Sequence, residues 1–188
     1  MKRFLVVGAV ALAVLAGTPS VASAAPFTGT IDYTGVHTSD LADLTLATST
    51  TISSAVVAFG TGSFAAMAGA LTHASPIVFR PVAGVPYLPL WSHPGTGISF
   101  NLLTMTIGPG NTKKSITLTG TGTFACVFPC VGLDPTPGFW IMTLNNSGKV
   151  KGSFSSSGAV VPEPALLALF GLGLFGAGVA ARRRRNRA

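Results

Sequence analysis

Hydrophobic and polar residues alternate along much of the chain between its two apolar ends. Leu103, Met105 and Ile107 alternate with polar residues, and Ile116 and Leu118 lie between threonines. A period of two is typical of strands with one buried face. Thr, Ser, Gly and Val are abundant in this middle part, and no long stretch places Leu and charged residues at helical spacing. The pattern therefore predicts an all-β fold.

Turn residues separate the expected strands. The segments 108–111, 134–138 and 146–148 are rich in Gly, Pro, Asn and Asp, which favour turns and loops. Strands are expected at 27–34, 41–52, 77–80, 97–107, 114–124, 139–145 and 150–155. The stretch 55–70 fits either strands with a turn at 60–62 or a short helix near 64–71, and we favour strands. Together these elements predict a single antiparallel β-sandwich or meander domain.

The N-terminal apolar run has the features of a secretory signal peptide over residues 1–24. A positive start at Lys2 and Arg3 precedes an apolar core at 4–17, and the small residues Ala22 and Ala24 mark a cleavage site. Cleavage after Ala24 is preferred to cleavage after Ala25, because the latter would place a proline just beyond the broken bond. The exported chain is therefore expected to start at Ala25, after passage through the Sec route.

The C-terminal apolar run has about the length of a short membrane helix. Seventeen apolar residues at 165–181, each rising about 1.5 Å, would span roughly 25 Å. A cytoplasmic stop formed by Arg182, Arg183, Arg184 and Arg185 follows, which predicts an inner-membrane anchor with a cytoplasmic C-terminus and an external domain. Just before the run, Pro162 and Pro164 disfavour helix and hold Glu163 in an extended segment, the conformation that a protease requires.

Val161-Pro162-Glu163-Pro164, the Leu-Phe-Gly-Leu-Gly-Leu core at 169–174 and the terminal arginines together resemble the PEP-CTERM sorting signal of exopolysaccharide-producing Gram-negative bacteria. Tails of this kind are also called ice-binding protein C-terminal domains, but that name implies no function for this chain. The resemblance implies that an exosortase, a membrane-embedded cysteine protease-transpeptidase, acts at Pro162, Glu163 and Pro164. The processed protein would then reach the cell surface or the extracellular space. A plain membrane anchor is the alternative, but it leaves the two prolines unexplained.

Residues 118–157 also resemble the final hairpins of many PEP-CTERM cargo domains, which implies a β-rich exported module without an established activity. The Ser and Gly residues within 155–159 are typical of a flexible linker between the domain and the sorting signal. The expected organisation is a signal peptide at 1–24, an exported β-rich domain at 25–152, a Ser/Gly spacer at 153–160 and a sorting signal at 161–188. Within the sorting signal, a helix is expected at 165–181 and an Arg-rich tail at 182–188.

Most of the positive charge of the chain lies in its two ends. Seven of the 12 basic residues lie in the targeting segments. Between residues 25 and 161 there remain five basic residues (Arg80, Lys113, Lys114, Lys149, Lys151) and four acidic ones (Asp32, Asp40, Asp43, Asp134). The high sequence pI of about 10.1 therefore reflects the ends, and we expect no binding to nucleic acid.

Cys126 and Cys130 are the only two cysteines. An exported chain meets an oxidising compartment, so we expect them to form a local disulfide. Because the loop between them is short, its contribution should be on the order of 2 kcal/mol or less. A redox motif would have two intervening residues instead of three, and a zinc site would require two further ligands.

Candidate catalytic residues are scarce. His37, His73 and His93 are far apart in the sequence and lack the close pairing of metal ligands. No Gly-x-Ser-x-Gly motif is present, and no Glu precedes Glu163 in the exported part, which leaves few carboxylates for glycoside hydrolysis. We therefore expect no enzymatic activity, no metal and no cofactor.

Two functions from different classes remain open. The first is a structural or adhesive protein of the cell envelope and its exopolysaccharide matrix, a biofilm role in which exopolysaccharide is a partner. The alternative is a small carbohydrate-binding module or enzyme that uses the same export route. Thr117, Thr119, Thr121 and Thr123 share one face of a strand and in principle match an ordered ligand such as carbohydrate or ice, but one such row is also a common solvent face. Trp91 and Trp140 are expected in the core, with sugar stacking as the alternative.

Overall fold

The computed structural model describes residues 25–81, 85–127, 130, 132–161 and 175. Their regular structure is almost entirely β, which confirms the predicted all-β class. The elements are β1 (Ala25–Pro26), β2 (Thr30–Ser39), β3 (Ser49–Gly60), the 3-10 helix η1 (Gly62–Phe64), β4 (Gly69–Ala70), β5 (Thr72–His73), β6 (Ile77–Val78), β7 (Tyr87–Ser92), β8 (Ile98–Ile107), β9 (Ser115–Cys126), β10 (Leu133–Asp134), β11 (Thr136–Asn146) and β12 (Lys151–Val160).

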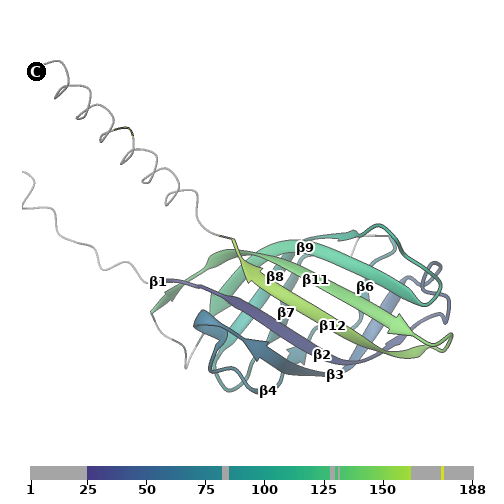
Figure 1. Ribbon diagram of the computed structural model, residues 1–188, viewed down its shortest axis with the longest axis horizontal. Helices are drawn as coiled ribbons and strands as arrows, with labels where there is room; N and C mark the ends of the chain where they lie inside the picture. The colour runs from purple at the N-terminus through teal and green to yellow at the C-terminus, as the bar shows by residue number, and fades with distance from the viewer. Residues whose placement is uncertain (1–24, 82–84, 128–129, 131, 162–174, 176–188) are drawn as a thin grey trace, which may run out of the picture.

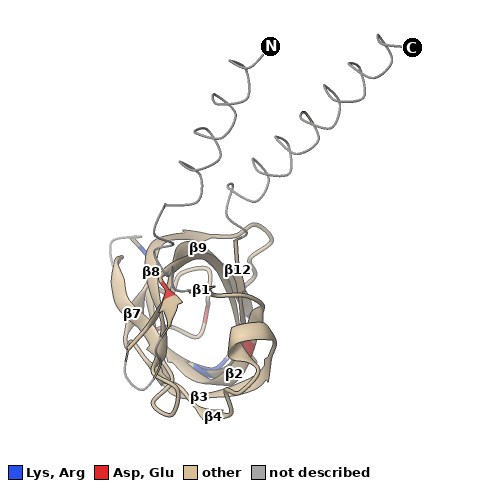
Figure 2. Cartoon of the chain, turned by 90° about the vertical axis from the view of Figure 1, so that its left-hand side faces the viewer, with Lys and Arg blue, Asp and Glu red and all other residues tan. Residues whose placement is uncertain are grey.

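The long strands form one antiparallel sheet that curls into a nearly closed barrel shape (Figures 1 and 2). Its strand order is β4-β3-β2-β12-β11-β9-β8-β7-β5, and β6 pairs with β3. The segment 69–73 joins the two edges, because Gly69 and Ala70 pair with β3 while Thr72 and His73 pair with β7. The architecture follows the predicted meander, with a single curled sheet in place of two stacked sheets.

Alternation along each strand separates a buried interior from an outer face. In β9, Ile116, Leu118 and Phe124 are buried, whereas the threonines between them point outward. The glycines of Thr-Gly-Thr-Gly-Thr point inward, where they leave room for neighbouring rings. A Cβ atom at Gly122 would overlap the backbone of Asn101, and one at Gly138 on β11 would overlap the ring of Phe124. Glycine therefore allows large aromatic side chains to pack in a narrow interior.

Aromatic side chains dominate that interior. The ring centroids of Phe100 and Phe124 are 4.8 Å apart, and those of Phe64 and Phe124 are 4.9 Å apart. Trp91 and Trp140 are each only 1% exposed, so the predicted core location of both tryptophans is confirmed. Rings at these separations add specific pair interactions to the burial of apolar area.

The strand predicted for 41–52 is wrong over residues 41–48. The chain leaves β2 at Ser39 and forms a loop, because the Asp40 carboxylate accepts hydrogen bonds from the backbone N–H groups of Leu41 and Thr48. Leu44 is fully buried in this loop. A loop that places an apolar side chain over the end of the core can thus show the same alternation as a strand. Residues 27–29, where a strand was also expected, lie outside β1 and β2.

Two further segments differ from expectation. β7 follows Pro86, contains Pro89 and has a register irregularity between Tyr87 and Trp91. The prolines concealed this strand, because proline removes the N–H that a sheet requires. In the ambiguous stretch 55–70, the strand prediction holds for residues 55–60 of β3 and for β4, and the only helical residues are the three of η1.

The Ser/Gly spacer predicted for 153–160 is also wrong. These residues belong to β12, which pairs with β11 on one side and with β2 on the other. Phe154 and Ser156 are buried, and Gly158 lies beside the Phe124 ring and Ile31. Small residues that resemble a linker are used here to fit a strand over bulky rings. The folded domain consequently extends to Val160, beyond the predicted boundary at residue 152.

The predicted signal peptide at 1–24 lies outside the described residues. So do the predicted tail helix at 165–181, apart from Phe175, and the Arg-rich end. Within the part of the chain that the structure describes, no helix has the length and apolar character needed to cross a membrane.

Candidate sorting and processing site

The first and last residues of the β domain meet at one end of the barrel (Figure 1). Ala25 opens β1, pairs with Leu133 and donates its N–H to Gly132 O at 3.1 Å. Val160 closes β12 and donates to Gly29 O at 3.3 Å. We call this the proximal end of the barrel. The two predicted processing points therefore flank a single structural end of the molecule.

The sorting motif is joined to the sheet without a spacer. Val161 directly follows β12, and its N–H donates to Pro137 O at 3.0 Å. The strand therefore ends at Val160, and Val161, the residue before Pro162, is still hydrogen-bonded to the sheet. The other residues of the predicted processing sites (Ala22, Ala24, Pro162, Glu163, Pro164, Arg182, Arg183, Arg184 and Arg185) lie outside the described residues.

This junction limits how a processing enzyme can approach. A fully extended chain advances at most about 3.6 Å per residue, so Pro164 lies within about 11 Å of Val161. An enzyme that holds Pro162 to Pro164 in its active site must consequently come close to the proximal end of the folded domain.

A disulfide lies at the same end. Cys126 is the last residue of β9 and is bonded to Cys130, with the two Cα atoms 5.6 Å apart. Between them, Val127 donates its N–H to Gly97 O at 3.0 Å, and the N–H of Cys130 donates to Val127 O at 2.9 Å. The disulfide and these two hydrogen bonds therefore hold Val127 and Cys130 close to the end of β9.

The three histidines do not form a catalytic or metal-binding group. Nδ1 of His37 lies 3.0 Å from Thr50 Oγ1, and its Nε2 donates to Asn145 O at 3.2 Å. His93 contacts Thr96 Oγ1 and Ala68 O. Burial lowers the pKa of His37, and it lowers the pKa of His73 to about 4. Among the described residues, no three His, Cys, Asp or Glu side chains are placed to share a metal ion.

The tryptophans cannot reach an external ligand in this arrangement. Trp140 donates from Nε1 to the hydroxyl of Tyr33 at 2.9 Å, deep in the interior. The ring of Trp91 packs against Phe100, with centroids 6.2 Å apart. Sugar stacking on either tryptophan is therefore inconsistent with the fold.

The outer face of the sheet carries hydroxyl groups in rows that cross the strands. The hydroxyl oxygens of Thr104 and Thr121 are 2.6 Å apart, and those of Thr106 and Thr119 are 2.9 Å apart. Another row runs across four strands, from Thr117 on β9 through Thr143 and Ser155 to Thr34 on β2. Sequence reasoning identified only the row along β9, because the rows across strands depend on register.

A hollow of about 250 Å³ lies on this outer face. Asp32, Thr143, Ser155 and Ser157 contribute polar groups to it, and the remaining lining residues are Ile141 and Ser156. Phe59, which is 58% exposed, pairs directly opposite Asp32 on the neighbouring strand β3. A carboxylate, hydroxyls and an exposed ring are groups that bind sugars in proteins. All three serines of the hollow lie in the predicted spacer 153–160, so the sequence did not indicate this site.

Comparison with known proteins identifies the tail. The family model described as "PEP-CTERM protein-sorting motif" matches residues 160–185. No curated protein and no solved structure matches the chain. The resemblance of the tail to a PEP-CTERM signal is thereby confirmed, and the match begins at the last residue of β12.

Proposed function

From the PEP-CTERM sorting motif that the chain carries, we propose that it is exported by the Sec route and held in the inner membrane by its tail. An exosortase then acts at Pro162 to Pro164, and the β domain becomes a structural or adhesive component of the cell surface or exopolysaccharide matrix. The motif itself indicates export and exosortase targeting. The observation that carries the proposal is the direct junction at Val161, because processing there would release the whole folded domain.

The polar contacts of the described domain support a non-catalytic role. Each histidine contacts a residue distant in the sequence, with Nε2 of His73 3.5 Å from the Tyr33 hydroxyl. Asp40 organises the loop that follows β2. The aromatic interior is packed with rings in direct contact. His37 lies beside the hydroxyl of Thr50, but both side chains are buried, whereas a nucleophile and its base must be reachable by a substrate.

The proposal is tested by following the protein in its native host with and without exosortase. We expect the processed domain in the cell-surface and matrix fractions of the parent strain, and the full-length protein in the membrane fraction of the exosortase-deficient strain. Deletion of the gene for this protein should weaken cell cohesion, and restoring the gene should recover it. A processed protein found free in the medium, with unchanged cell cohesion after deletion, would argue against the structural role.

A second candidate function rests on the outer hollow. Its carboxylate, its hydroxyls and the neighbouring Phe59 favour a saccharide-binding module. Replacing both Asp32 and Phe59 by Ala should weaken retention on a neutral polysaccharide resin by roughly tenfold, as expected when a hydrogen-bonded group and a stacking ring are lost. Thr38→Ala, on the outer face of the same strand β2, is the matched control. Equal retention of the double variant and the control would eliminate this candidate.

A further inference from the structure

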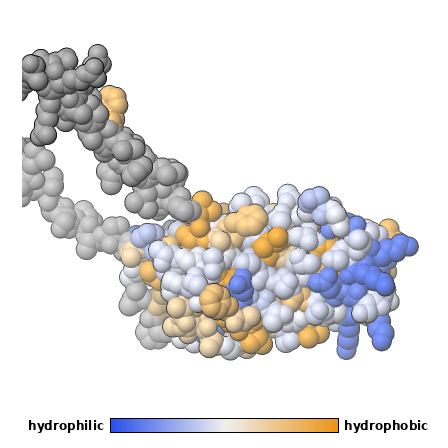
Figure 3. Space-filling view, in the orientation of Figure 1, coloured by the Kyte–Doolittle hydropathy of each residue, from blue (hydrophilic) through white to orange (hydrophobic). Residues whose placement is uncertain are grey.

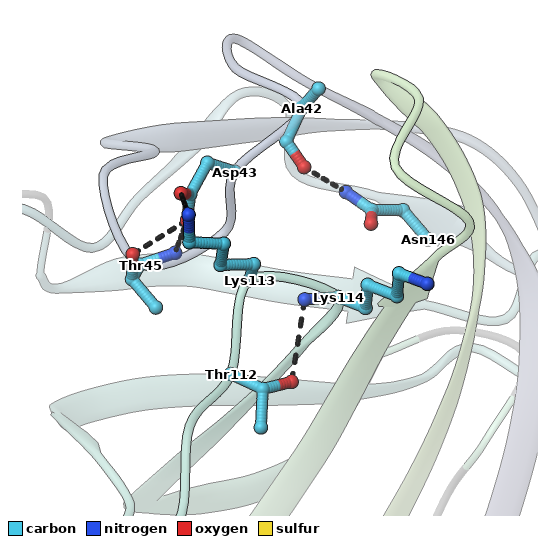
Figure 4. Close-up of polar contacts among 7 residues, drawn as sticks. All are labelled: Ala42, Asp43, Thr45, Thr112, Lys113, Lys114 and Asn146. Carbon is cyan, nitrogen blue, oxygen red and sulfur yellow. Dashed lines mark hydrogen bonds and ion pairs between the residues drawn. The ribbon is translucent and has the colours of Figure 1, made fainter.

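The end of the barrel opposite the termini is built from three loops that hydrogen-bond to one another. We call it the distal end, and its loops comprise residues 40–48, 108–114 and 147–150. Leu44 donates its N–H to Lys113 O, and Asn146 donates its N–H to Lys114 O, both at 2.9 Å. The side-chain amide of Asn146 donates to Ala42 O at 2.8 Å (Figure 4). These bonds hold the loops in a fixed arrangement.

Every lysine of the exported domain lies at this end. Lys113 and Lys114 precede β9, and Lys149 and Lys151 flank the start of β12. All four are exposed, and the side chain of Lys113 is 81% exposed. Figure 3 shows the resulting hydrophilic patch at the end of the barrel away from β1. Two hairpins far apart in sequence thus present one cationic surface.

The two acidic residues of the distal end organise the loop 40–48, and Asp43 also pairs with a lysine of the neighbouring loop. Asp40 accepts hydrogen bonds from the N–H groups of Thr48 and Ser49. Asp43 accepts from the N–H of Thr45 at 3.0 Å, and one of its oxygens lies 3.7 Å from Lys113 Nζ (Figure 4). Arg80 donates to the carbonyl oxygens of Leu44 and Ala47 and so secures the same loop. Asp40 is also exposed, so four exposed lysines outnumber the two carboxylates of this end.

The charge of the domain is therefore polarised. Its five basic and four acidic residues sum to +1. The distal end holds all five basic residues, together with Asp40 and Asp43, for a local sum of +3. The rest of the domain holds Asp32 and Asp134, for a local sum of −2. A near-neutral composition thus conceals a positive end that lies opposite Ala25 and Val161 (Figure 1).

We propose that the distal end binds an acidic polysaccharide, a polymer that carries carboxylate or sulfate groups along its chain. Lys114 and Lys151 lie at the starts of β9 and β12, which β11 separates, so two strand spacings of about 4.8 Å place them roughly 10 Å apart. Because lysine side chains are long and flexible, two lysines whose backbone positions are this close can contact neighbouring anionic groups of one polymer chain. The inference rests on the proposed function, because it assigns the matrix partner and the surface that contacts it.

The test uses the full chain in nanodiscs of neutral lipid. The seven basic residues outside 25–161 are replaced by Gln in every protein, so that only the distal end supplies positive charge. One variant replaces Lys113, Lys114, Lys149 and Lys151 by Gln, and the matched control replaces the same four by Arg. The probe is polygalacturonate, with neutral dextran and duplex DNA as comparisons. Thermal unfolding of all variants checks that each remains folded.

We expect the parent and the Arg variant to bind polygalacturonate, and the Gln variant to bind it roughly tenfold more weakly or worse, since four exposed ion pairs are lost. Binding should disappear near 1 M salt, where the screening length falls to about 3 Å, and dextran should not bind. If the four-fold Gln variant is unfolded, the pairs Lys113→Gln with Lys114→Gln and Lys149→Gln with Lys151→Gln are measured separately. Undiminished binding by folded Gln variants, or tighter binding to DNA or to phosphatidylglycerol vesicles than to polygalacturonate, would overturn the inference.

The failure of this site and the failure of the proposed function give different results. Polysaccharide binding in nanodiscs by a protein that stays unprocessed in the host membrane would uphold the site and reject the function. A processed protein whose Gln variant is retained in the matrix as well as the parent would uphold the function and reject the site.

Discussion

The two ends of the barrel differ in what they offer to their surroundings. The proximal end holds Ala25, Val161 and the disulfide, and the described residues there include no Lys or Arg. The distal end holds four exposed lysines on hairpins that hydrogen-bond to one another. One small domain thus keeps its two termini apart from its charged surface, so a tether at one end would leave the other end free.

The strand topology explains this separation. β2 and β12 are antiparallel neighbours, so the start of β2 and the end of β12 lie at the same end of the sheet. The hairpins β8-β9 and β11-β12 consequently turn at the opposite end. A meander that begins and ends side by side therefore leaves one end free of termini.

The largest effect is expected from a change in the motif at the proximal end. Glu163→Ala should abolish processing, because the resemblance assigns Glu163 to the segment that exosortase recognises. An immunoblot of host fractions should then show only the longer form in the membrane. Asp32→Asn, which removes a carboxylate from the barrel surface, is the control and should mature normally. Normal maturation of Glu163→Ala would break the assignment of the proximal end as the processing site.

The next largest effect is expected from truncating a buried side chain near either end of the barrel. Phe27 packs against Phe64 and Phe124 near the proximal end, and Leu44 is buried under the distal loops. Phe27→Ala should lower the free energy of unfolding by about 3–5 kcal/mol and Leu44→Ala by about 2–5 kcal/mol. Urea unfolding measures both, with the partly exposed Phe139→Ala as a control expected to change it by roughly 0.5 kcal/mol. A small loss at only one position would show that this end is not part of the cooperative core.

Lowering the pH should reduce the free energy of unfolding of the domain, because the unfolded state protonates His73 and His37 more readily than the folded state does. Burial lowers the pKa of His73 to about 4 in the folded state, while the unfolded value is 6.5. Above pH 6.5 both states carry a neutral His73, but between pH 6.5 and 4 the unfolded state binds the proton first. Stability should fall over that window by about 3 kcal/mol from this group. His37, whose pKa burial also lowers, acts in the same direction.

Urea midpoints measured across that pH range check this expectation. His73→Gln should make the dependence on pH shallower, although the variant itself is less stable at neutral pH. An identical slope in the parent and the variant would show that His73 does not titrate as its burial requires.

The smallest effect is expected from the disulfide of the proximal end. Replacing Cys126 and Cys130 by Ser should cost on the order of 2 kcal/mol or less, because the bond closes a short loop. The same midpoint measurement tests the variant against the oxidised parent. The distal lysine surface should retain its affinity for polygalacturonate, since it lies at the other end. A loss of that affinity would show that the two ends are coupled.

The sequence predicted the all-β class of the fold better than it predicted how the sheet curls into a barrel shape. Alternation in the segments around Met105 and Leu118 identified β8 and β9 correctly. It identified only the first half of β12, through the strand predicted at 150–155, because Ser and Gly in 153–160 also have the composition of a linker while they fit a strand over Phe124. It also placed a strand at 41–48, where Asp40 and buried Leu44 form a loop that caps the core.

The two candidate sites also differed in how well the sequence predicted them. The sorting motif was predictable because its parts are contiguous in the sequence and need no folding to be recognised. The distal surface was not, because Lys114 and Lys151 come together only through the register of β9, β11 and β12. The sequence showed a near-neutral domain, and only the fold shows that its basic residues gather at one end.

The most direct test of the central claim is the intact mass of the protein isolated from its native host, measured separately for the membrane and the extracellular matrix. The account predicts a matrix species that starts at Ala25 and ends between Val161 and Pro164, with any attached group added to that mass. A species that still extends to Ala188 in the membrane, with no shortened form in the matrix although exosortase is active, would contradict it.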